Sequence, residues 1–420
     1  MEKKAKKNIN LYAIYELFGY DLHFFLIIGI YFLTEVKNLT ITQFLLLNAV
    51  ISLFTAIFQI PTGIITDKVG RKQCVVLGNL FFMLFGIVLM LGNHFFSFAI
   101  AAMFLGIGYS LKSAAETPLL IDSLTLLKKQ DEFGKFEGKA FAIYSYVSCA
   151  LALVSGYIYT INNYLPIILM ILFAFFAFVF SLFFTNIELK EGSDKKSSTE
   201  LQYLKECAKH LFFSKRLKSL LFFVFAFAGI LVISIDFSKI ALQETGISVT
   251  LFGVIQAIFC LFVGFGSQLQ FKLEQKLKKK TLTVLSIVFI ISFIIIGILG
   301  FLDIISNLQI ILLVLIVISQ RIVSGIYGIS SQKYFTNFTS QQVRGKMISI
   351  LYLVQELGAT TFLALSTLVL DKTESIYKSY MILGAIFLVL FIFILGYMRK
   401  RVGLEPDEYT RQDLKFDTLL

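Results

Sequence analysis

The stretch "GIITDKVGRKQ", Gly63 to Gln73, decides how this chain is organised. It lies between two long apolar runs and carries four charged residues: Asp67, Lys68, Arg71 and Lys72. Apolar runs of about 18 or more residues predict membrane-spanning helices. The stretch therefore predicts a charged loop that joins two spans. Gly70 allows a tight turn there, and Gly63 allows a neighbouring helix to approach closely.

The composition predicts the same class for the whole chain. Of its 420 residues, 57% are hydrophobic and 15% are charged, and the mean hydropathy is +0.81. Soluble domains carry about 25% charged residues, so we expect an all-α integral membrane protein. The first apolar segment, Leu11 to Leu33, is too long for the core of a signal peptide and contains Glu16 and Asp21. We expect it to be a retained first span.

Hydropathy and charge predict twelve spans with both termini in the cytoplasm. Lys and Arg concentrate in alternate loops, which by the positive-inside rule are cytoplasmic. The net charge of +11 is therefore a topology signal with lipid headgroups as its counter-charge, and not a sign of nucleic-acid binding. We expect a multi-pass protein of the cell membrane. The predicted spans are 11–33, 42–66, 73–92, 96–123, 139–161, 164–185, 218–243, 249–271, 281–302, 308–332, 346–370 and 377–398.

The spans fall into two related halves. "GKAFAIYSYV" from Gly138 reappears as "GKMISILYLV" from Gly345, which indicates an internal duplication. We expect a six-helix bundle over residues 1–185, a cytoplasmic linker over 186–217, a second six-helix bundle over 218–398 and a cytoplasmic tail over 399–420. Within the linker, apolar residues at helical spacing between Leu201 and Phe213 predict an amphipathic helix on the membrane surface. Two halves with a site between them are typical of transporters.

The opening stretch fits the pattern G-x-x-x-D-[RK]-x-G-R-[RK] at every defined position, in the loop after the second span. It resembles the signature loop of the major facilitator superfamily. The resemblance implies two pseudo-symmetric bundles that alternate access to a central site. It also implies a conformational latch: Asp67 accepts hydrogen bonds from the start of the eleventh span, and Arg71 pairs with Asp122. The alternative is a plain positive-inside loop. The residues of the predicted latch are Gly63, Asp67, Gly70, Arg71, Lys72 and Asp122.

Two features depart from the drug–proton antiporters of that family. Many members have an arginine in span four where this chain has Ala102. Exporters often have a Gly-Pro motif in span five, but Ser145 to Thr160 contains Gly156 and no proline. Both departures weaken the match to drug–proton antiport and leave the predicted fold unchanged.

Ionisable residues inside spans are costly and mark functional sites by default. The resemblance implies that spans one, four, seven and ten line the central cavity, and each of them carries such residues here. Each residue also has a structural alternative: pairing along its helix, packing, or exposure to solvent. The candidate substrate- or proton-binding residues are Asp21, Lys112, Glu116, Asp236, Arg321 and Glu356.

The candidates have different expected roles. Asp21 has no cationic neighbour one turn away, and desolvation favours the protonated form of such a carboxylate. We expect Asp21 and Glu116 to bind protons or cations, although Lys112 and Glu116 are also spaced to neutralise each other. Arg321 is expected to hold an anionic substrate or to act as a counter-charge. Asp236 and Lys239, three residues apart, can pair likewise, and they can also belong to a gate or a solvated rim. Glu356 either faces a cavity or bonds within the bundle.

Four further side-chain types have simpler expected roles. We expect Glu16 to be solvated near the cytoplasmic entrance and His23 to be a packing or interfacial residue. Phe24, Phe25 and Phe237 are candidates to line an aromatic drug pocket. The four cysteines show no zinc-ligand spacing and no sign of structural disulfides: Cys74, Cys149, Cys207 and Cys260.

We therefore expect a secondary transporter and not an enzyme. The chain has no phosphate-binding loop for ATP hydrolysis, so we expect a proton gradient to supply the energy, with no cofactor and no metal. The favoured function is export of an amphipathic organic compound by proton antiport. The alternatives are proton-coupled import of a small, possibly anionic metabolite and translocation of lipid-linked cargo. We expect a monomer that contacts its small-molecule substrate, protons and the bilayer, and no nucleic acid.

Overall fold

The computed structural model describes residues 1–129, 132–187, 215–277, 280–302, 306–337 and 344–399. All regular elements in these residues are helices. Twelve of the helical segments are long and apolar enough to cross a membrane, so the predicted all-α class and the number of spans are confirmed. The predicted linker helix at 201–213, Cys207 and residues 400–420 of the predicted tail lie outside the described residues.

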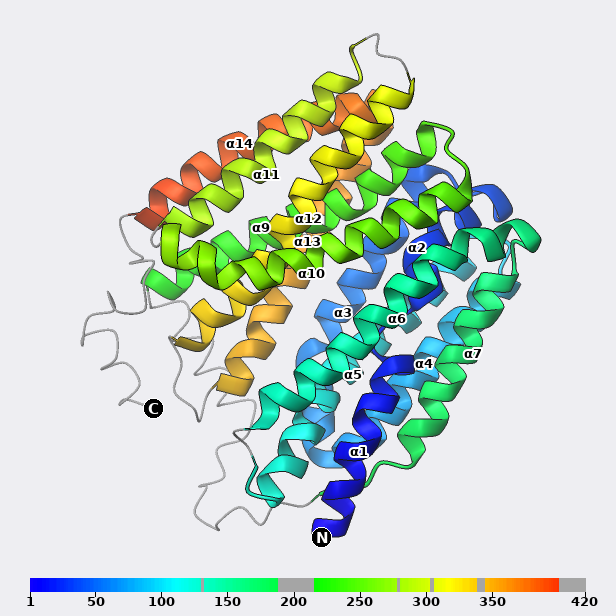
Figure 1. Ribbon diagram of the computed structural model, residues 1–420, viewed down its shortest axis with the longest axis vertical. Helices are drawn as coiled ribbons and strands as arrows, with labels where there is room; N and C mark the ends of the chain where they lie inside the picture. Colours follow the sequence, from blue (N-terminus) through cyan, green and yellow to red (C-terminus); the bar gives the residue numbers. More distant parts are fainter. Residues whose placement is uncertain (130–131, 188–214, 278–279, 303–305, 338–343, 400–420) are drawn as a thin grey trace. The chain divides into compact units, whose positions relative to one another are not determined.

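The chain forms two compact units. Unit 1 is Met1–Ser197 with Ser248–Ala257, and unit 2 is Ser198–Ile247 with Ile258–Leu420. In Figure 1 the helices α1 to α7 of unit 1 run from blue to teal, and the helices from α9 on run from green to red; the start of α10 belongs to unit 1. Before residue 200 the elements are α1 (Glu2–Gly19), α2 (His23–Tyr31), the π-helix η1 (Phe32–Val36), α3 (Ile41–Val69), α4 (Arg71–Leu91), α5 (Phe95–Leu126), α6 (Phe133–Ile161) and α7 (Leu165–Leu182). The later elements are α9 (Lys215–Glu244), α10 (Val249–Leu277), α11 (Thr281–Leu299), α12 (Ser306–Asn337), α13 (Arg344–Thr373) and α14 (Ile376–Arg399).

The first span is not the continuous helix that the sequence predicted. It starts at Glu2 and is interrupted at residues 20–22, between α1 and α2. Side chains bind two carbonyl groups at this break. His23 Nε2 lies 2.8 Å from the Leu17 carbonyl oxygen, and Lys112 Nζ donates to the Gly19 carbonyl oxygen. The break is tolerated because these side chains replace helical hydrogen bonds that the backbone has lost.

The loop between α3 and α4 consists of a single residue, Gly70. Its φ of 105° lies in the region that favours glycine, so the predicted tight turn is confirmed. Asn186, beyond the end of α7, stabilises the start of α4: the Lys72 N–H donates to its Oδ1 at 2.8 Å, and its Nδ2 donates to Gln73 Oε1 at 2.6 Å. The opening stretch is thus tied to the end of α7 inside unit 1.

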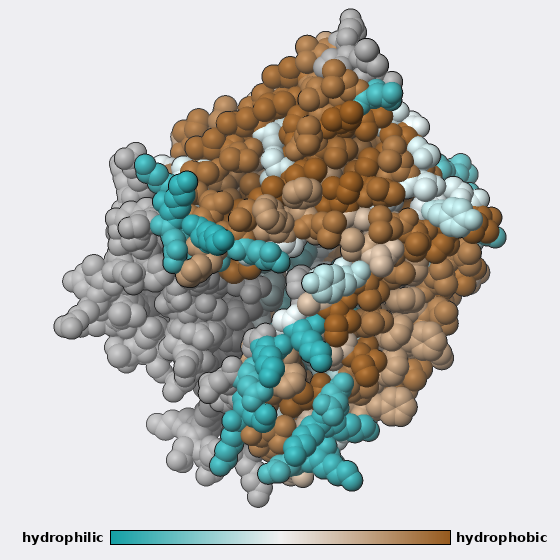
Figure 2. Space-filling model, in the orientation of Figure 1, coloured by the Kyte–Doolittle hydropathy of each residue, from teal (hydrophilic) through white to brown (hydrophobic). Residues whose placement is uncertain are grey.

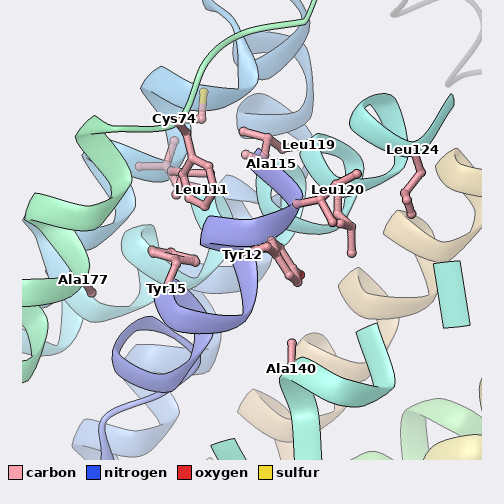
Figure 3. Close-up of a cluster of buried hydrophobic side chains, with 13 residues drawn as sticks. Tyr12, Tyr15, Cys74, Leu111, Ala115, Leu119, Leu120, Leu124, Ala140 and Ala177 are labelled. Atoms are coloured by element: carbon pink, nitrogen blue, oxygen red, sulfur yellow. The ribbon is translucent and has the colours of Figure 1, made fainter. Parts of the chain in front are cut away.

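Buried side chains from α1, α4, α5, α6 and α7 form the core around α1 (Figure 3). Tyr12 and Tyr15 of α1 lie next to Leu111, Ala115 and Leu119 of α5 in this cluster. The buried stripe of α1 also includes polar residues, namely Asn8 and Glu16. The first span therefore carries its polar side chains into the interior of unit 1.

The visible surface is largely hydrophobic over both units (Figure 2). Large apolar side chains are exposed, including Phe96 at 81% and Phe393 at 71%. Such exposure is unfavourable in water and normal against lipid. Together with the twelve apolar helices, it shows a multi-pass membrane protein.

Glycines set the close packing of α5 on its neighbours. A Cβ atom on Gly106 would lie 2.5 Å from the Ile51 carbonyl oxygen and 2.8 Å from Phe54 Cβ, both on α3. A Cβ on Gly78 of α4 would lie 2.6 Å from Lys112 Cγ. By contrast, a Cβ on Gly63 would meet no heavy atom of the described residues within 4 Å. The close approach of another helix at Gly63 stays a prediction.

We predict that Gly106→Ala destabilises the protein by about 1–3 kcal/mol, because the new methyl group pushes α3 and α5 apart. The thermal unfolding temperature of the purified protein in detergent measures the effect. Gly138→Ala on α6 is the matched control, since a Cβ there meets nothing within 4 Å among the described residues. Equal unfolding temperatures for the two variants would contradict the packing role of Gly106.

Candidate functional site

Lys112 of α5 is the centre of a buried polar site in unit 1. The residue is 2% exposed. Its Nζ lies 2.7 Å from Glu116 Oε1, 3.0 Å from the Tyr15 hydroxyl and 3.2 Å from Asn79 Oδ1, and it also donates to the Gly19 carbonyl oxygen. The rings of Tyr15 and Phe82 lie 5.2 Å and 4.8 Å from the same nitrogen. The ammonium is therefore surrounded by oxygen atoms and aromatic faces.

Glu116 is held in place by the same neighbours. Its Oε1 accepts a hydrogen bond from the Tyr15 hydroxyl as well as the ion pair with Lys112. Asn79 Nδ2 donates to the Tyr15 oxygen at 2.8 Å and to the Val75 carbonyl oxygen. The predicted pairing of Lys112 with Glu116 is present, and the pair is buried: the side chains are 3% and 14% exposed.

Two more carboxylates lie close to this pair. Glu16 is 3% exposed, so the expectation that it is solvated is wrong. Its Oε2 has no hydrogen-bond partner among the described residues, and its charge interacts with Glu116, Lys112 and Glu137. Glu137 of α6 accepts a hydrogen bond from the Tyr12 hydroxyl at 3.0 Å. We call Glu16, Glu116 and Glu137 the acid cluster.

Asp21 lies in the break between α1 and α2. Its Oδ1 accepts hydrogen bonds from the Leu22 N–H at 2.7 Å and from the Tyr109 hydroxyl. Among the described residues Asp21 forms no ion pair. Its side-chain partner is the phenol of Tyr109 and not a cation. Tyr109, Lys112 and Glu116 are spaced three and four residues apart on α5. One face of α5 thus bonds both the break and the acid cluster.

His23 has a structural role at the same break. Its Nε2 lies against the Leu17 carbonyl oxygen, which only accepts hydrogen bonds, so this nitrogen carries the hydrogen. Its Nδ1 lies 2.7 Å from the Ser148 hydroxyl of α6. The ring also packs against Tyr144 and Phe173. His23 therefore behaves as the packing residue that was expected.

Unit 2 contains a second buried polar site around Arg321 of α12. Arg321 is 6% exposed; its Nη2 donates to Ser238 Oγ at 2.6 Å and its guanidinium lies 5.3 Å from the Phe259 ring centre. The charge of Asp236 acts on Arg321, and Lys239 Nζ lies 3.7 Å from Asp236 Oδ1. Among the described residues, Arg321, Lys239 and Asp236 give the site two cations and one carboxylate.

Neutral hydrogen bonds extend the Arg321 site. The neighbouring Gln320 accepts from the Ser234 hydroxyl at 2.6 Å, and its Nε2 donates to the Ser292 oxygen at 2.7 Å. Both bonds are fully buried. They fix α9, α11 and α12 around Arg321, so that its guanidinium has a defined direction.

The predicted latch is present in part. Arg71 forms an ion pair with Asp122 and also donates to the Pro118 carbonyl oxygen, with the Arg71 and Asp122 side chains 30% and 13% exposed. The side chain of Asp67 lies outside the described residues. Glu356 of α13 is partly buried and has interaction partners. The functional roles of the latch residues and of Glu356 stay predictions.

The phenylalanines proposed for an aromatic pocket are core residues. Phe24 packs edge-on against Phe173, Phe25 against Phe85, and Phe237 against Tyr380. They are between 0% and 9% exposed. Their role is therefore to pack helices within each unit, and they give no support to an aromatic drug site.

Sequence reasoning missed four residues of the site in unit 1. The first three, Tyr15, Asn79 and Tyr109, carry no charge, so a search for ionisable residues passes over them. Glu137 lies just before the apolar part of its span and looked like a loop residue. One signal was available: Asn79 is the only polar side chain in the run "CVVLGNLFFMLFGIVLML", Cys74 to Leu91.

Comparison with known proteins now identifies the family. The Major Facilitator Superfamily model matches residues 13–287 and 237–416. The chain belongs to the major facilitator superfamily, as the opening stretch predicted, and is a transporter rather than an enzyme.

Two similar relatives are themselves uncharacterised transporters of this type. One, MJ1317 from Methanocaldococcus jannaschii, is 27% identical over 167 residues, which is 39% of this chain and 40% of the relative. The other, YxaM from Bacillus subtilis, is 24% identical over 209 residues, 49% of this chain and 51% of the relative. The chain thus matches about half the length of these relatives or less. The names of the two relatives give no substrate.

Solved structures show the fold. The nucleoside transporter NupG matches with a TM-score of 0.74 at 14% identity, over 96% of this chain and 100% of that one. A D-xylose-proton symporter matches with a TM-score of 0.69 at 13% identity, over 96% and 99%. At such low identity these likenesses establish the architecture and leave the substrate open.

We predict that Lys112→Met destabilises the protein by about 3–5 kcal/mol, because it leaves a buried carboxylate without its counter-charge. The double variant Lys112→Met/Glu116→Gln should be more stable than the single one, since it removes both charges. Thermal unfolding of the purified protein compares them.

The surface pair Lys129–Glu132, with side chains 50% and 36% exposed, supplies the control. Lys129→Met should leave the unfolding temperature nearly unchanged, since exposed pairs contribute little. If Lys112→Met is as stable as the double variant or more stable, the Lys112 ammonium does not neutralise Glu116.

Proposed function

We propose that the chain is a proton-coupled secondary transporter whose acid cluster in unit 1 binds the proton. One observation supports the proposal: among the described residues, the buried Oε2 of Glu16 has no hydrogen-bond partner, and the nearby ammonium of Lys112 is already paired with Glu116. Lys112 supplies one positive charge against three carboxylates. Burial of unpaired charge is costly, and a bound proton removes part of that cost.

The break in the first span supports a site at this place. Membrane transporters build their sites from discontinuous helices, because the break exposes backbone groups and helix ends inside the protein. Here Lys112 holds the end of α1 through the Gly19 carbonyl oxygen while it neutralises Glu116. Protonation of the acid cluster weakens the pull on Lys112 and so changes how firmly the break is held. This links proton binding to the shape of the first span.

The surroundings of Arg321 indicate the class of substrate that we propose. The site in unit 2 has one positive charge in excess, and its guanidinium is oriented by Ser238. A guanidinium in such a setting pairs well with a carboxylate or phosphate. We propose that the substrate is a small organic anion that moves together with a proton. The Arg71–Asp122 pair then serves as the latch of the alternating-access cycle, in a cell membrane with both termini cytoplasmic.

Export of an amphipathic organic cation by proton antiport is the second candidate. The observation that favours it is the negative surplus of the acid cluster. A site with three carboxylates and one ammonium takes either a proton or an organic cation, and competition between the two produces antiport. The buried packing of Phe24, Phe25 and Phe237 speaks against an aromatic drug pocket made by those residues.

A ligand screen on the purified protein separates the two candidates. Small carboxylates, their uncharged analogues and organic cations are tested for an increase of the unfolding temperature at acidic and alkaline pH. We predict that carboxylates stabilise the protein, and more strongly at acidic pH, because proton and anion bind together. Arg321→Gln should weaken carboxylate binding about 10- to 100-fold, the equivalent of a lost charged hydrogen bond.

Glu16→Gln should keep carboxylate binding and lose its pH dependence. The exposed Lys129→Gln is the matched control for Arg321→Gln, since it also removes one positive charge. Stabilisation by organic cations at alkaline pH, unaffected by Arg321→Gln, would favour the antiporter and reject the anion symporter.

A further inference from the structure

A surface groove in unit 1, which shares no lining residue with the Lys112 site, has two chemically different ends. It is a shallow, wide-open groove with a volume of about 530 Å³. One wall is α1 and the other is the end of α7. The lining residues are Lys3, Lys6, Lys7, Asn10, Leu11, Ile14, Phe180 and Phe183. The α1 members of this set recur at helical spacing, so they form one continuous stripe along that helix.

The two walls are fixed to each other by Asn8. Its Nδ2 donates to the Thr185 carbonyl oxygen at 2.8 Å, and its Oδ1 accepts from the Thr185 N–H at 2.9 Å. Asn8 Nδ2 also lies 3.2 Å from Ser123 Oγ on α5. Because Asn8 is 1% exposed, these bonds are shielded from water. These bonds hold α1 and the chain just beyond α7 together, so the spacing of the two walls is fixed by buried Asn8.

The first end of the groove is strongly basic. Its three lysines are exposed, with Lys6 and Lys7 one turn of α1 beyond Lys3, and none of the described lining residues is acidic. Lys7 Nζ lies 5.7 Å from the centre of the Phe183 ring, at the point where the basic end meets the apolar end. Figure 2 shows hydrophilic side chains gathered at the end of unit 1 where Figure 1 marks the N-terminus, directly beside hydrophobic surface.

The second end of the groove is apolar and opens toward the membrane-facing surface. Ile14 is 51% exposed and Phe183 is 52% exposed. Phe180 is stacked on Phe18 at 5.5 Å, and exposed Phe176 extends the same face of α7. Exposed apolar side chains in a row along a membrane-spanning helix fit an acyl chain. A soluble phosphate or nucleotide would leave this half of the groove empty.

We propose that the groove binds one anionic glycerophospholipid, with its phosphate at Lys3, Lys6 and Lys7 and an acyl chain along Ile14, Phe180 and Phe183. The basic and apolar ends follow one another in the order of a lipid's own parts, from headgroup to chain. Lysines beside a membrane attract anionic lipids, and the apolar track adds a contact that headgroup attraction alone does not supply. This site is independent of the proposed proton and substrate sites.

Quenching of a single tryptophan tests the proposal. The chain contains no tryptophan, so Phe183→Trp introduces the only indole, at the join of the two ends. The full chain with this substitution is reconstituted in phosphatidylcholine vesicles that contain a small fraction of dibrominated phosphatidylglycerol or, separately, dibrominated phosphatidylcholine. We predict several-fold stronger quenching by the brominated phosphatidylglycerol at equal mole fraction.

Two triple variants of the Phe183→Trp protein test whether the groove causes the stronger quenching by brominated phosphatidylglycerol. Lys3→Gln/Lys6→Gln/Lys7→Gln should reduce the quenching to the phosphatidylcholine level. Lys4→Gln/Lys128→Gln/Lys139→Gln removes the same charge from exposed lysines that do not line the groove, and it should keep the preference.

Equal loss in both triple variants would mean general surface attraction and would overturn the proposal. Equal quenching by both brominated lipids in the Phe183→Trp protein would overturn it as well. Circular dichroism confirms that each variant is folded before the comparison.

Discussion

The structure of unit 1 depends on how one buried ammonium group is satisfied. Lys112 cannot be placed in an apolar interior without partners. It obtains them from two other helices and from its own: Tyr15 and the Gly19 carbonyl of α1, Asn79 of α4, and Glu116 of α5. These contacts explain why α1 can end inside the membrane-spanning region. They also explain why Gly78 faces Lys112, since a Cβ there would collide with the lysine stem.

The two buried sites differ in charge, and this difference organises the proposed function. In unit 1 carboxylates outnumber the single lysine, whereas in unit 2 Arg321 and Lys239 outnumber Asp236. Each surplus is a cost of folding that evolution retains only where a ligand or proton offsets it. A proton suits the first site and an anion suits the second. In the proposed cycle, the proton neutralises the excess negative charge of the first site and the anion neutralises the excess positive charge of the second.

Much of the fold and part of the site followed from the sequence. The twelve spans, the turn at Gly70, the Arg71–Asp122 pair and the Lys112–Glu116 pair depend on hydropathy, glycine and local spacing, which are properties of short segments. The break at residues 20–22 did not follow, because it is stabilised by side chains from α5 and α6 that are distant in sequence. The burial of Glu16 was missed for the same reason: it depends on which face of α1 packs inward.

Asp21 and Glu16 show what cannot be predicted from the residues next to them in the sequence. Asp21 was expected to bind a proton because it lacks a cation on its own helix, and the structure adds hydrogen bonds to it from Tyr109 and from the Leu22 N–H. Glu16 was expected to be solvated, yet it is buried and its Oε2 has no hydrogen-bond partner among the described residues. Partners from other helices decide the chemistry of each group, and only the folded chain shows them.

The most direct measurement is the infrared absorption of protonated carboxyl groups in the purified protein as the pH is raised. We predict a carbonyl band of a carboxylic acid that is present at acidic pH and is lost as the proton dissociates. This band should be weaker in Glu16→Gln. Asp236→Asn, which changes a paired carboxylate of unit 2, should leave that band unchanged. A spectrum in which Glu16→Gln matches the unsubstituted protein at every pH would contradict the claim that the acid cluster holds a proton through Glu16.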